Sequence, residues 1–386
     1  MPISIEKKEQ CTGCGACWNI CPKNCISSQV DEEGFPYPHV DTSICINCDL
    51  CVKVCPVINK RKQVTEIKEV YAVWSKDKEI RYTSTSGGAF TELAKGIIDQ
   101  VGVVVGAAYD ENDLVHHIEI SKYDDLSLIR QSKYIQSDIE GVYKEIKELL
   151  KYDKKVLFCG APCQVAGLKH FLKKDFENLY TVDFICRGMN SPKAYTYWLK
   201  ELEDSFHSHV NRVWFKYKKN GWKRSPLCTR VDFKNGQTFV AEDERNTFMQ
   251  GYLHGNLYLR PSCSECRFKG ADRYSDITLA DFWKIDPKYD DDGGTSMLML
   301  NTLKGKDLFS MVKERMVYYQ QDYTDIEKGN VCFNQSVRLN PRGREFLMRL
   351  GEKPFSELVD EYTKIPGYKK IIKKAKRIVQ KLTESN

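Results

Sequence analysis

The chain has 386 residues, of which 41% are hydrophobic, and its 59 basic and 53 acidic residues give a formal net charge of +6. This apolar content is sufficient for packed cores and excludes an intrinsically disordered chain. The longest apolar stretch, residues 101–108, is too short to span a bilayer, which excludes a polytopic membrane protein. The N-terminus has no apolar signal-peptide core, so we predict a cytoplasmic protein of two or three domains.

Cysteine is the unusual residue here, because nine of the 16 cysteines precede residue 56. The cytoplasm keeps thiols reduced, so they indicate metal or redox chemistry rather than disulfides. Residues 11–21 and 45–55 both follow the pattern C-x2-C-x2-C-x3-C, and a proline follows each. In this pattern three thiolates hold one 4Fe–4S cluster and the fourth ligates the other cluster. We therefore predict two crossed ligand sets, which are Cys11, Cys14, Cys17 and Cys55, and Cys45, Cys48, Cys51 and Cys21.

Two structural zinc sites are the alternative, but zinc usually binds two separated C-x2-C pairs rather than two such runs. The ninth cysteine, Cys25, is interpreted as a small buried side chain beside a cluster. Residues 31–41 predict a small hairpin or turn-rich excursion between the two runs. Over about residues 1–60 the chain resembles a bacterial two-cluster ferredoxin domain, and we place this domain at residues 1–62.

From residue 70 the pattern changes to strands that alternate with helices. This alternation predicts an α/β unit with parallel strand pairing. The predicted strands are residues 71–74, 101–110, 155–160 and 180–186, and the predicted helices are residues 89–98, 139–150 and 165–172. After about residue 210 the chain is richer in strands and loops, which predicts a mixed second half.

Four cysteines of this second region occupy positions typical of site residues. Cys163 opens a helix directly after a strand, Cys186 ends another strand, and Cys263 and Cys266 form a C-x2-C pair. Together they could hold a third 4Fe–4S cluster, although zinc binding remains an alternative, as does a Cys159–Cys163 dithiol. The other cysteines, Cys159, Cys228 and Cys332, are interpreted as buried packing residues.

Two further segments carry weaker signals. Residues 84–94, STSGGAFTELA, place hydroxyl groups and glycines at a helix N-terminus, which could bind phosphate or could simply cap the helix. Residues 131–137, QSKYIQS, concentrate polar groups between two predicted helices, and alone Lys133 would be a solvated lysine.

Taken together, six segments resemble the coenzyme F420 hydrogenase/dehydrogenase beta-subunit family, in the form with an N-terminal two-cluster ferredoxin domain. They occur in the order of the family and cover most of residues 70–340. The segments are SGGAF (86–90), SKYIQS (132–137), GAPCQVAGL (160–168), DFICRG (183–188), RPSCSECRF (260–268) and SDITLADFW (275–283).

This resemblance implies a fold that binds FAD, with a 4Fe–4S cluster beside it held by Cys163, Cys186, Cys263 and Cys266. It also implies that Lys133 lies near the flavin ring, where a cation stabilises the reduced anionic form. The implied FAD contacts are Ser86, Gly87, Gly88, Ser132, Lys133, Tyr134 and Ser137. The chain departs from the family at Ala161, where relatives often have a hydroxyl residue, and at Ala280, where they often have glycine.

We therefore predict an α+β chain, in which a small ferredoxin-like two-cluster head is followed by a mixed α/β flavoprotein body at residues 70–350, divided near residue 150. The predicted function is an oxidoreductase that passes electrons between a redox partner protein or small carrier, its clusters and FAD. The small-molecule substrate, F420 or another, is left open. No catalytic residue is assigned, and Asp281 and His170 are only candidate proton donors. The alternatives are a cluster-only electron-transfer subunit and a dithiol oxidoreductase.

Residues 351–386 are predicted to be a basic helical tail. Residues 365–386 carry seven basic residues and one acidic residue, so the rest of the chain is formally neutral. Apolar residues recur at helical spacing at Ile371, Ala375, Ile378 and Leu382. We predict a terminal helix packed on the body, with peripheral contact of residues 366–386 with an anionic inner membrane face or a partner as the alternative. A basic tail alone does not indicate nucleic acid.

Overall fold

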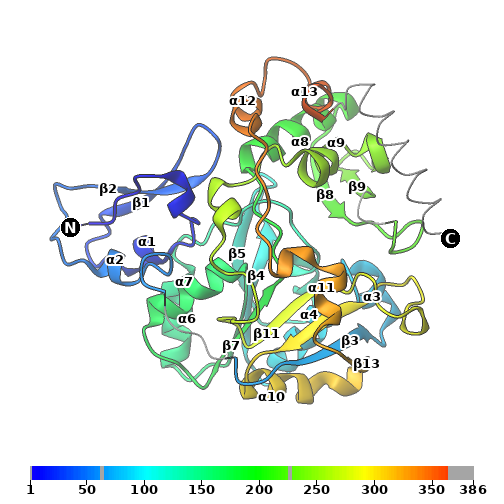
Figure 1. Cartoon of the computed structure of the whole chain (residues 1–386), viewed down its shortest axis with the longest axis horizontal. Coiled ribbons are helices and arrows are strands. Elements are labelled where there is room, and N and C mark those ends of the chain that lie inside the picture. The colour runs from blue at the N-terminus through cyan, green and yellow to red at the C-terminus, as the bar shows by residue number, and fades with distance from the viewer. Residues whose placement is uncertain (1, 61–64, 225–227, 364–386) are drawn as a thin grey trace, which may run out of the picture.

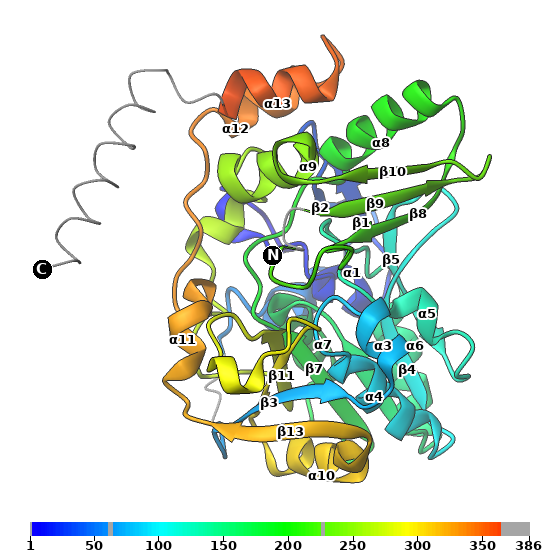
Figure 2. The same ribbon diagram turned by 90° about the vertical axis from the view of Figure 1, so that its right-hand side faces the viewer.

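The computed structural model describes residues 2–60, 65–224 and 228–363. Three units are visible in Figure 1: the N-terminal head, a unit built on an eight-stranded sheet, and a smaller unit built on a three-stranded sheet. In the view turned by 90°, the smaller unit again lies above the large sheet (Figure 2). The predicted arrangement of a small head before a mixed α/β body is confirmed.

The head consists of a hairpin and two short helices, and each helix lies within one of the cysteine runs. The predicted hairpin forms from β1 (Ile26–Val30) and β2 (Pro36–Val40), which pair antiparallel. Helix α1 (Ala16–Ile20) begins after Gly15, whose φ of 85° lies in the left-handed region that glycine adopts readily. Helix α2 is Leu50–Lys53. Each cysteine run is thus a tight loop that turns into a short helix.

The eight-stranded sheet has the order β13-β3-β12-β11-β7-β6-β4-β5, and its four central strands, β11, β7, β6 and β4, are parallel. Its central strands are buried on both faces, which explains why their sequences are nearly continuous apolar runs. The strands are β3 (Glu69–Ser75), β4 (Val103–Tyr109), β5 (Val115–Ile120), β6 (Val156–Cys159), β7 (Leu179–Phe184), β11 (Ile277–Asp281), β12 (Ser296–Leu300) and β13 (Met316–Gln321).

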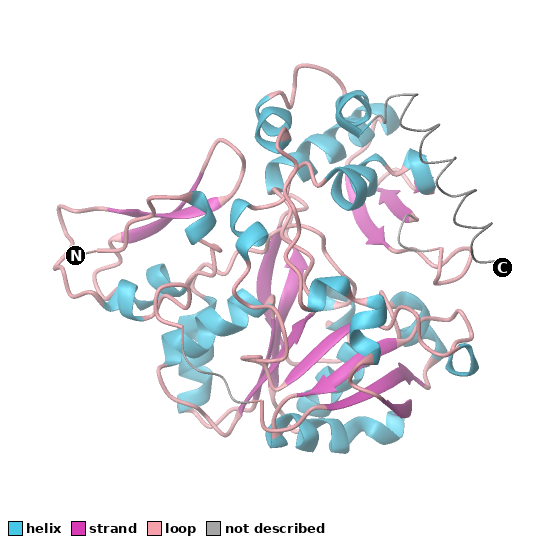
Figure 3. Cartoon of the chain, in the orientation of Figure 1, coloured by secondary structure: helices cyan, strands magenta, loops and turns pink. Residues whose placement is uncertain are grey.

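Helices cover both faces of this sheet, as the colouring by secondary structure shows (Figure 3). Helices α4 and α10 pack on one face, and α6 and α7 pack on the other, where the head also docks. The predicted helix at 89–98 is α4, with the same bounds. The helices of this unit are α3 (Lys78–Thr83), α4 (Ala89–Ile98), α5 (Leu126–Ile129), α6 (Val142–Lys151), α7 (Pro162–Leu172), α10 (Leu303–Val312) and α11 (Asp325–Gly329).

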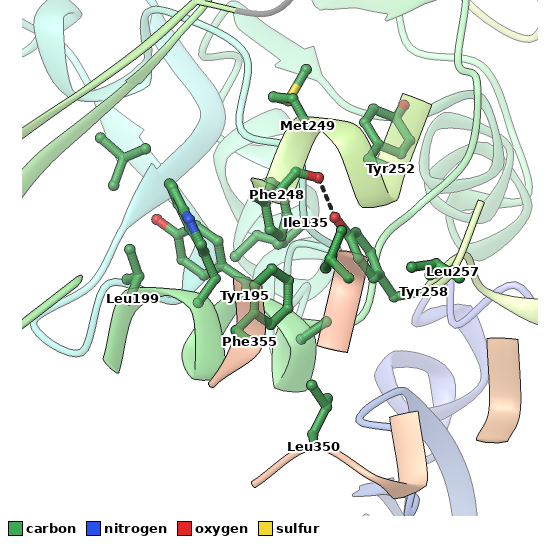
Figure 4. Close-up of a cluster of buried hydrophobic side chains, with 14 of the residues drawn as sticks. Ile135, Tyr195, Leu199, Phe248, Met249, Tyr252, Leu257, Tyr258, Leu350 and Phe355 are labelled. Carbon is green, nitrogen blue, oxygen red and sulfur yellow. Dashed lines mark hydrogen bonds between the residues drawn. The ribbon is translucent and has the colours of Figure 1, made fainter. Parts of the chain in front are cut away.

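The smaller unit has its own core around the antiparallel sheet β10-β9-β8. Aromatic side chains dominate this core, and the hydroxyl of Tyr258 donates a hydrogen bond to the carbonyl of Phe248 within it (Figure 4). Its elements are α8 (Pro192–Phe206), β8 (Val210–Phe215), β9 (Thr229–Phe233), β10 (Thr238–Ala241), α9 (Thr247–Gln250), a π-helix (Gly251–Gly255), α12 (Gly343–Met348) and α13 (Phe355–Thr363). Short 3-10 helices lie at Lys8–Gln10, Asp243–Arg245, Pro261–Glu265, Pro287–Tyr289, Lys313–Arg315 and Val331–Phe333.

The described part of the predicted tail is a packed helix. In α13, Phe355, Leu358 and Val359 are buried in the core of the smaller unit. The predicted amphipathic helix and its surface contact at residues 366–386 lie outside the described residues. Within the ranges that the structure describes, no helix is long and apolar enough to cross a bilayer.

Ser191 ties the head to the smaller unit and caps α8, so its removal should destabilise the protein. Its hydroxyl donates to the carbonyl of Glu33 at 2.5 Å and accepts from the amide of Ala194 at 3.4 Å. We expect Ser191→Ala to lower the free energy of unfolding by about 1–2 kcal/mol in urea denaturation. The control is Thr196→Ala, at an exposed site on the same helix, with an expected change below about 0.5 kcal/mol. Equal effects of the two substitutions would contradict this role.

Candidate functional site

Each predicted cysteine set of the head surrounds a separate cavity. Cys11, Cys14, Cys17 and Cys55 line one, which we call the inner head cavity. Cys21, Cys45, Cys48 and Cys51 line the other, which we call the outer head cavity. The crossing arises because α1 carries Cys17 and then leads directly to Cys21. The geometry therefore brings both crossed sets together.

Cys25 also lines the outer head cavity. Its Sγ lies 3.3 Å from the Sγ of Cys21, and its side chain is buried. The interpretation of Cys25 as a small buried side chain beside a cluster site therefore agrees with its position.

The four body cysteines also line one common cavity, which we call the body cavity: Cys163, Cys186, Cys263 and Cys266. The segments meet because β6 leads into α7, β7 ends before Cys186, and the C-x2-C pair lies on the 3-10 helix Pro261–Glu265 and its end. The Sγ of Cys263 accepts a hydrogen bond from the amide of Met189 at 3.4 Å. Cys332, interpreted above as a packing residue, lies on the wall of this cavity too.

Burial favours the neutral form of several of these thiols. Burial raises the pKa of Cys186 to about 12, and burial together with neighbouring Cys55 raises the pKa of Cys14 to about 12. Such thiols stay protonated at neutral pH until a metal displaces their protons. Nowhere in the described ranges do three or more histidine, cysteine or acidic side chains lie where they could hold a single metal ion. The sulfurs line the walls of spaces, as a polynuclear cluster with several irons requires.

A larger cavity of about 740 Å³ lies at the carboxyl ends of the parallel strands. In sheets of this kind, ligands bind outside the carboxyl ends of the strands. Strand ends contribute Cys159 of β6, Phe184 of β7 and Asp281 of β11, while the smaller unit closes the other side with Met249 and Tyr252. This volume is within the range of sites for small molecules and cofactors.

Six of the seven expected FAD contacts line this large cavity: Ser86, Gly88, Ser132, Lys133, Tyr134 and Ser137. Gly87 is the exception, because its amide donates to the hydroxyl of Ser296 at 2.9 Å and it packs against β3. A Cβ at Gly87 would lie 2.3 Å from the carbonyl oxygen of Val73, so its role in the structure is close packing. Both departures from the family pattern, Ala161 and Ala280, also face this cavity.

Lys133, which the family resemblance places near the flavin ring, lies on the wall of the large cavity. Its Nζ donates to the carbonyl of Arg130 at 3.0 Å and lies 5.5 Å from the ring centre of Tyr109. Burial lowers the pKa of Lys133 to about 7. No carboxylate is among these partners, so the amine can respond to an anionic group placed in the cavity.

His117 on β5 is a wall residue that the sequence analysis missed. Its Nδ1 lies 2.7 Å from the hydroxyl of Ser137, and its Nε2 lies 3.0 Å from the carbonyl oxygen of Cys159. Burial lowers the pKa of His117 to about 4, so the ring is neutral at physiological pH. The segment VHHIEI contains two adjacent histidines, and only the alternation of a strand indicates which one faces inward.

Of the two candidate proton donors, only Asp281 faces the cavity. Its carboxylate forms a buried ion pair with Lys216, another missed residue, which follows β8 with a left-handed φ of 53°. The charge of Asp281 raises the pKa of Lys216 against the opposing effect of burial. His170 lies elsewhere, inside α7, where its Nε2 is 3.4 Å from the hydroxyl of Tyr274. The geometry thus separates the two candidates.

The cavities adjoin one another in a row. Thr12 lines both the inner head cavity and the body cavity. Cys186, Cys332 and residues 187–189 line both the body cavity and the large cavity. Helix α7 spans the first junction, because its first turn holds Cys163 and its Gly167 packs against Cys14, where an added Cβ would lie 3.1 Å from the Cys14 Cβ.

Comparisons with known proteins agree with this arrangement. The family model for the C terminus of the beta subunit of coenzyme F420 hydrogenase/dehydrogenase matches residues 153–326, and a 4Fe–4S dicluster domain model matches residues 10–59. The first match contains all four predicted cluster cysteines of the body, and the second contains all eight predicted cluster cysteines of the head.

Three of the matches to individual proteins cover between 14% and 78% of this chain. An uncharacterized ferredoxin of Methanocaldococcus jannaschii is 40% identical over 52 residues, which are 14% of this chain and 66% of that protein. The coenzyme F420-dependent sulfite reductase of the same organism is 26% identical over 161 residues, 41% of this chain, and the chain spans only 24% of that enzyme. A chain of the F420-reducing NiFe hydrogenase complex from Methanosarcina barkeri aligns over 78% of this chain and 89% of its own length, with 18% identity and a TM-score of 0.43.

Because His117 is buried and neutral, acid should destabilise the protein partly through this residue. The unfolded chain binds a proton at His117 below about pH 6.5, whereas the folded chain does so only near pH 4, so stability falls between these values. We expect the free energy of unfolding, measured by urea denaturation, to fall less between pH 7.5 and pH 5 in His117→Gln than in the wild type. Exposed His39→Gln is the control and should follow the wild type. Parallel pH profiles of the wild type and His117→Gln would contradict this assignment.

Proposed function

Because the chain belongs to the coenzyme F420 hydrogenase/dehydrogenase beta-subunit family and carries a 4Fe–4S dicluster domain, we propose that it is an oxidoreductase with three 4Fe–4S clusters and one FAD. The row of adjoining cavities is the observation that carries this proposal. When bound, the clusters would transfer single electrons, and the flavin would exchange them for two-electron chemistry on a substrate.

Twelve cysteines would hold the clusters. The outer head cavity offers Cys21, Cys45, Cys48 and Cys51; the inner head cavity offers Cys11, Cys14, Cys17 and Cys55; the body cavity offers Cys163, Cys186, Cys263 and Cys266. The inner head cavity would serve as the link, because α1, which lines it, leads directly to Cys21 of the outer cavity, and because it shares Thr12 with the body cavity. A redox partner would accordingly meet the head at the outer cavity, where Cys48 is exposed.

The large cavity has separate features that suit the two ends of FAD. The N-terminus of α4, a ten-residue helix preceded by Ser84, Ser86 and Gly88, lies on the cavity wall, where free amide groups favour phosphate. Arg130 adds a cation there, and its guanidinium donates to the hydroxyls of Thr83 and Thr91. Lys133, whose Nζ donates to the carbonyl of Arg130 at 3.0 Å, would favour the reduced, anionic flavin ring.

This cavity also favours an enzyme over the alternative of a cluster-only electron-transfer subunit. A pure relay requires cysteine sites close together but no further chamber, whereas here a cavity of about 740 Å³ adjoins the body cavity. Space beside Asp281, Lys216 and Trp283 would admit a small substrate next to the flavin. F420 is one candidate substrate, because the matched family and one matched relative, an F420-dependent sulfite reductase, are named for it.

Iron and flavin content test this function. Protein purified and reconstituted without oxygen should contain about twelve irons per chain and one flavin with its visible absorption bands. About eight irons without flavin would instead support the relay subunit, and zinc without visible absorbance would contradict both functions.

Loss of one body cysteine should remove the third cluster alone. We expect Cys186→Ser to lower the iron content to about eight per chain, because the two head sites keep all their ligands. Cys228→Ser is a matched control, since Cys228 is buried but lines none of the four cavities described above. An unchanged iron content in Cys186→Ser would refute the body ligand set.

Lys133 provides a test of the flavin site. Lys133→Met keeps the length of the side chain but removes the cation, so the reduced anionic flavin loses a stabilising charge. We expect a lower flavin reduction potential in dye-coupled spectroscopic titration, with the flavin still bound. Lys147→Met, on helix α6 and away from the cavity wall, is the control and should leave the potential unchanged. An unshifted potential in Lys133→Met would place the flavin ring elsewhere.

A further inference from the structure

Arg260 is a buried cation at the junction between head and body. Only 1% of its surface is exposed, and its guanidinium donates three hydrogen bonds. Nε donates to the carbonyl of Cys11 at 2.8 Å, Nη2 to the carbonyl of Pro36 at 2.9 Å, and Nη1 to Oε1 of Gln136 at 2.9 Å. Arg260 therefore bonds to both a cysteine run and the hairpin of the head.

None of these acceptors carries a formal charge. The guanidinium also lies over the rings of Tyr37, at 4.3 Å, and Phe35, at 5.4 Å, which compensate only part of the lost hydration. Among the described residues, the ion pairs of the neighbouring carboxylates Asp31 and Glu33 are made with Lys8 and Arg344, not with Arg260. Burial of a charge without an opposite charge is strongly unfavourable, so an anion bound near Arg260 would offset this cost.

Two of the cysteine cavities lie against this guanidinium. Arg260 itself lines the body cavity, and its carbonyl accepts a hydrogen bond from the amide of Cys263 at 3.0 Å. On the head side, a Cβ at Gly13, a wall residue of the inner head cavity, would lie 2.9 Å from Nη1 of Arg260. Gln136 completes the contact, because its Nε2 lies 3.3 Å from the carbonyl oxygens of Thr12 and Gly13.

We propose that Arg260 is the shared counter-charge of the two clusters held by the inner head cavity and the body cavity, and that it raises the reduction potential of both. The inference rests on the proposed function for the presence of these clusters. Four thiolates make each cluster anionic, and each added electron increases its negative charge. A nearby cation in a medium of low dielectric constant therefore stabilises the reduced forms. The outer head cavity is not lined by Arg260, so a cluster there is outside this effect.

The test is a redox titration of the anaerobically reconstituted full chain, followed by electron paramagnetic resonance at low temperature. We expect Arg260→Gln to lower the equilibrium constant for reduction at least tenfold at the inner head and body clusters, which is about 59 mV for a one-electron couple. The outer head cluster should titrate as in the wild type. Arg260→Lys retains the charge while losing hydrogen bonds, so the two potentials should lie close to the wild-type values. If the role of Arg260 is purely structural, Arg260→Lys should behave like Arg260→Gln.

A second variant leaves the arginine in place. Gln136→Glu puts a carboxylate against the guanidinium with little change of shape, so it should shift the same two potentials in the same direction even if Arg260→Gln does not fold. Arg267→Gln is the matched control, because Arg267 also donates to a head carbonyl, that of Val57 at 3.0 Å, but is exposed and screened by water. In Arg267→Gln we expect the equilibrium constants for reduction of the clusters to change less than threefold.

Iron content, measured on each sample, separates the two claims. A wild type with only about eight irons overturns the third cluster of the proposed function. The role of Arg260 is then tested by the potential of the inner head cluster alone. Full iron content with unmoved potentials in both Arg260→Gln and Gln136→Glu overturns the role of Arg260. Equal shifts at all three clusters also overturn it, because they would reflect a general change of structure.

Discussion

The close approach of the first cysteine run to helix α7 is the constraint on which the site depends. Gly167 has no side chain, and so Cys14 can pack directly on the helix whose first turn carries Cys163. The hydroxyl of Tyr143 lies 2.7 Å from the carbonyl oxygens of both Cys14 and Gln164, which ties the head loop to the same helix. One helix thereby sets the separation between a head site and the body site. In electron-transfer proteins this separation must stay short, and a rigid helix between the two sites keeps it so.

The body provides the second half of the same arrangement. Parallel strands end at one edge of the sheet, so the residues that follow β6, β7 and β11 meet there although they are far apart in the sequence. Cys186 and Cys332 form part of the wall between the body cavity and the large cavity. The smaller unit, formed largely by residues inserted between β7 and β11, lies above the large sheet (Figure 2), and its Met249 and Tyr252 line the large cavity. The body cavity and the large cavity thus share one wall.

The sequence predicts those parts that depend on local patterns. The two cysteine runs predict their own ligand sets, because the spacing is a local constraint, and α4 and the central strands follow from apolar periodicity. Long-range contacts are harder to infer. Helix α8 and strands β12 and β13 were missed, and His117, Lys216 and Arg260 acquire their positions only when distant segments pack together. Gly87 packs closely against β3, a contact that its motif did not indicate, and its contact with FAD stays a prediction.

Three iron–sulfur sites that follow one another from the head into the body would be visible in an anomalous difference map at the iron absorption edge, measured on crystals of the protein purified without oxygen. We expect three separate iron peaks in a row, with the peak at Cys11, Cys14, Cys17 and Cys55 in the middle and the last peak beside the large cavity. Iron peaks confined to the head, with none among Cys163, Cys186, Cys263 and Cys266, would rule out the cluster of the body.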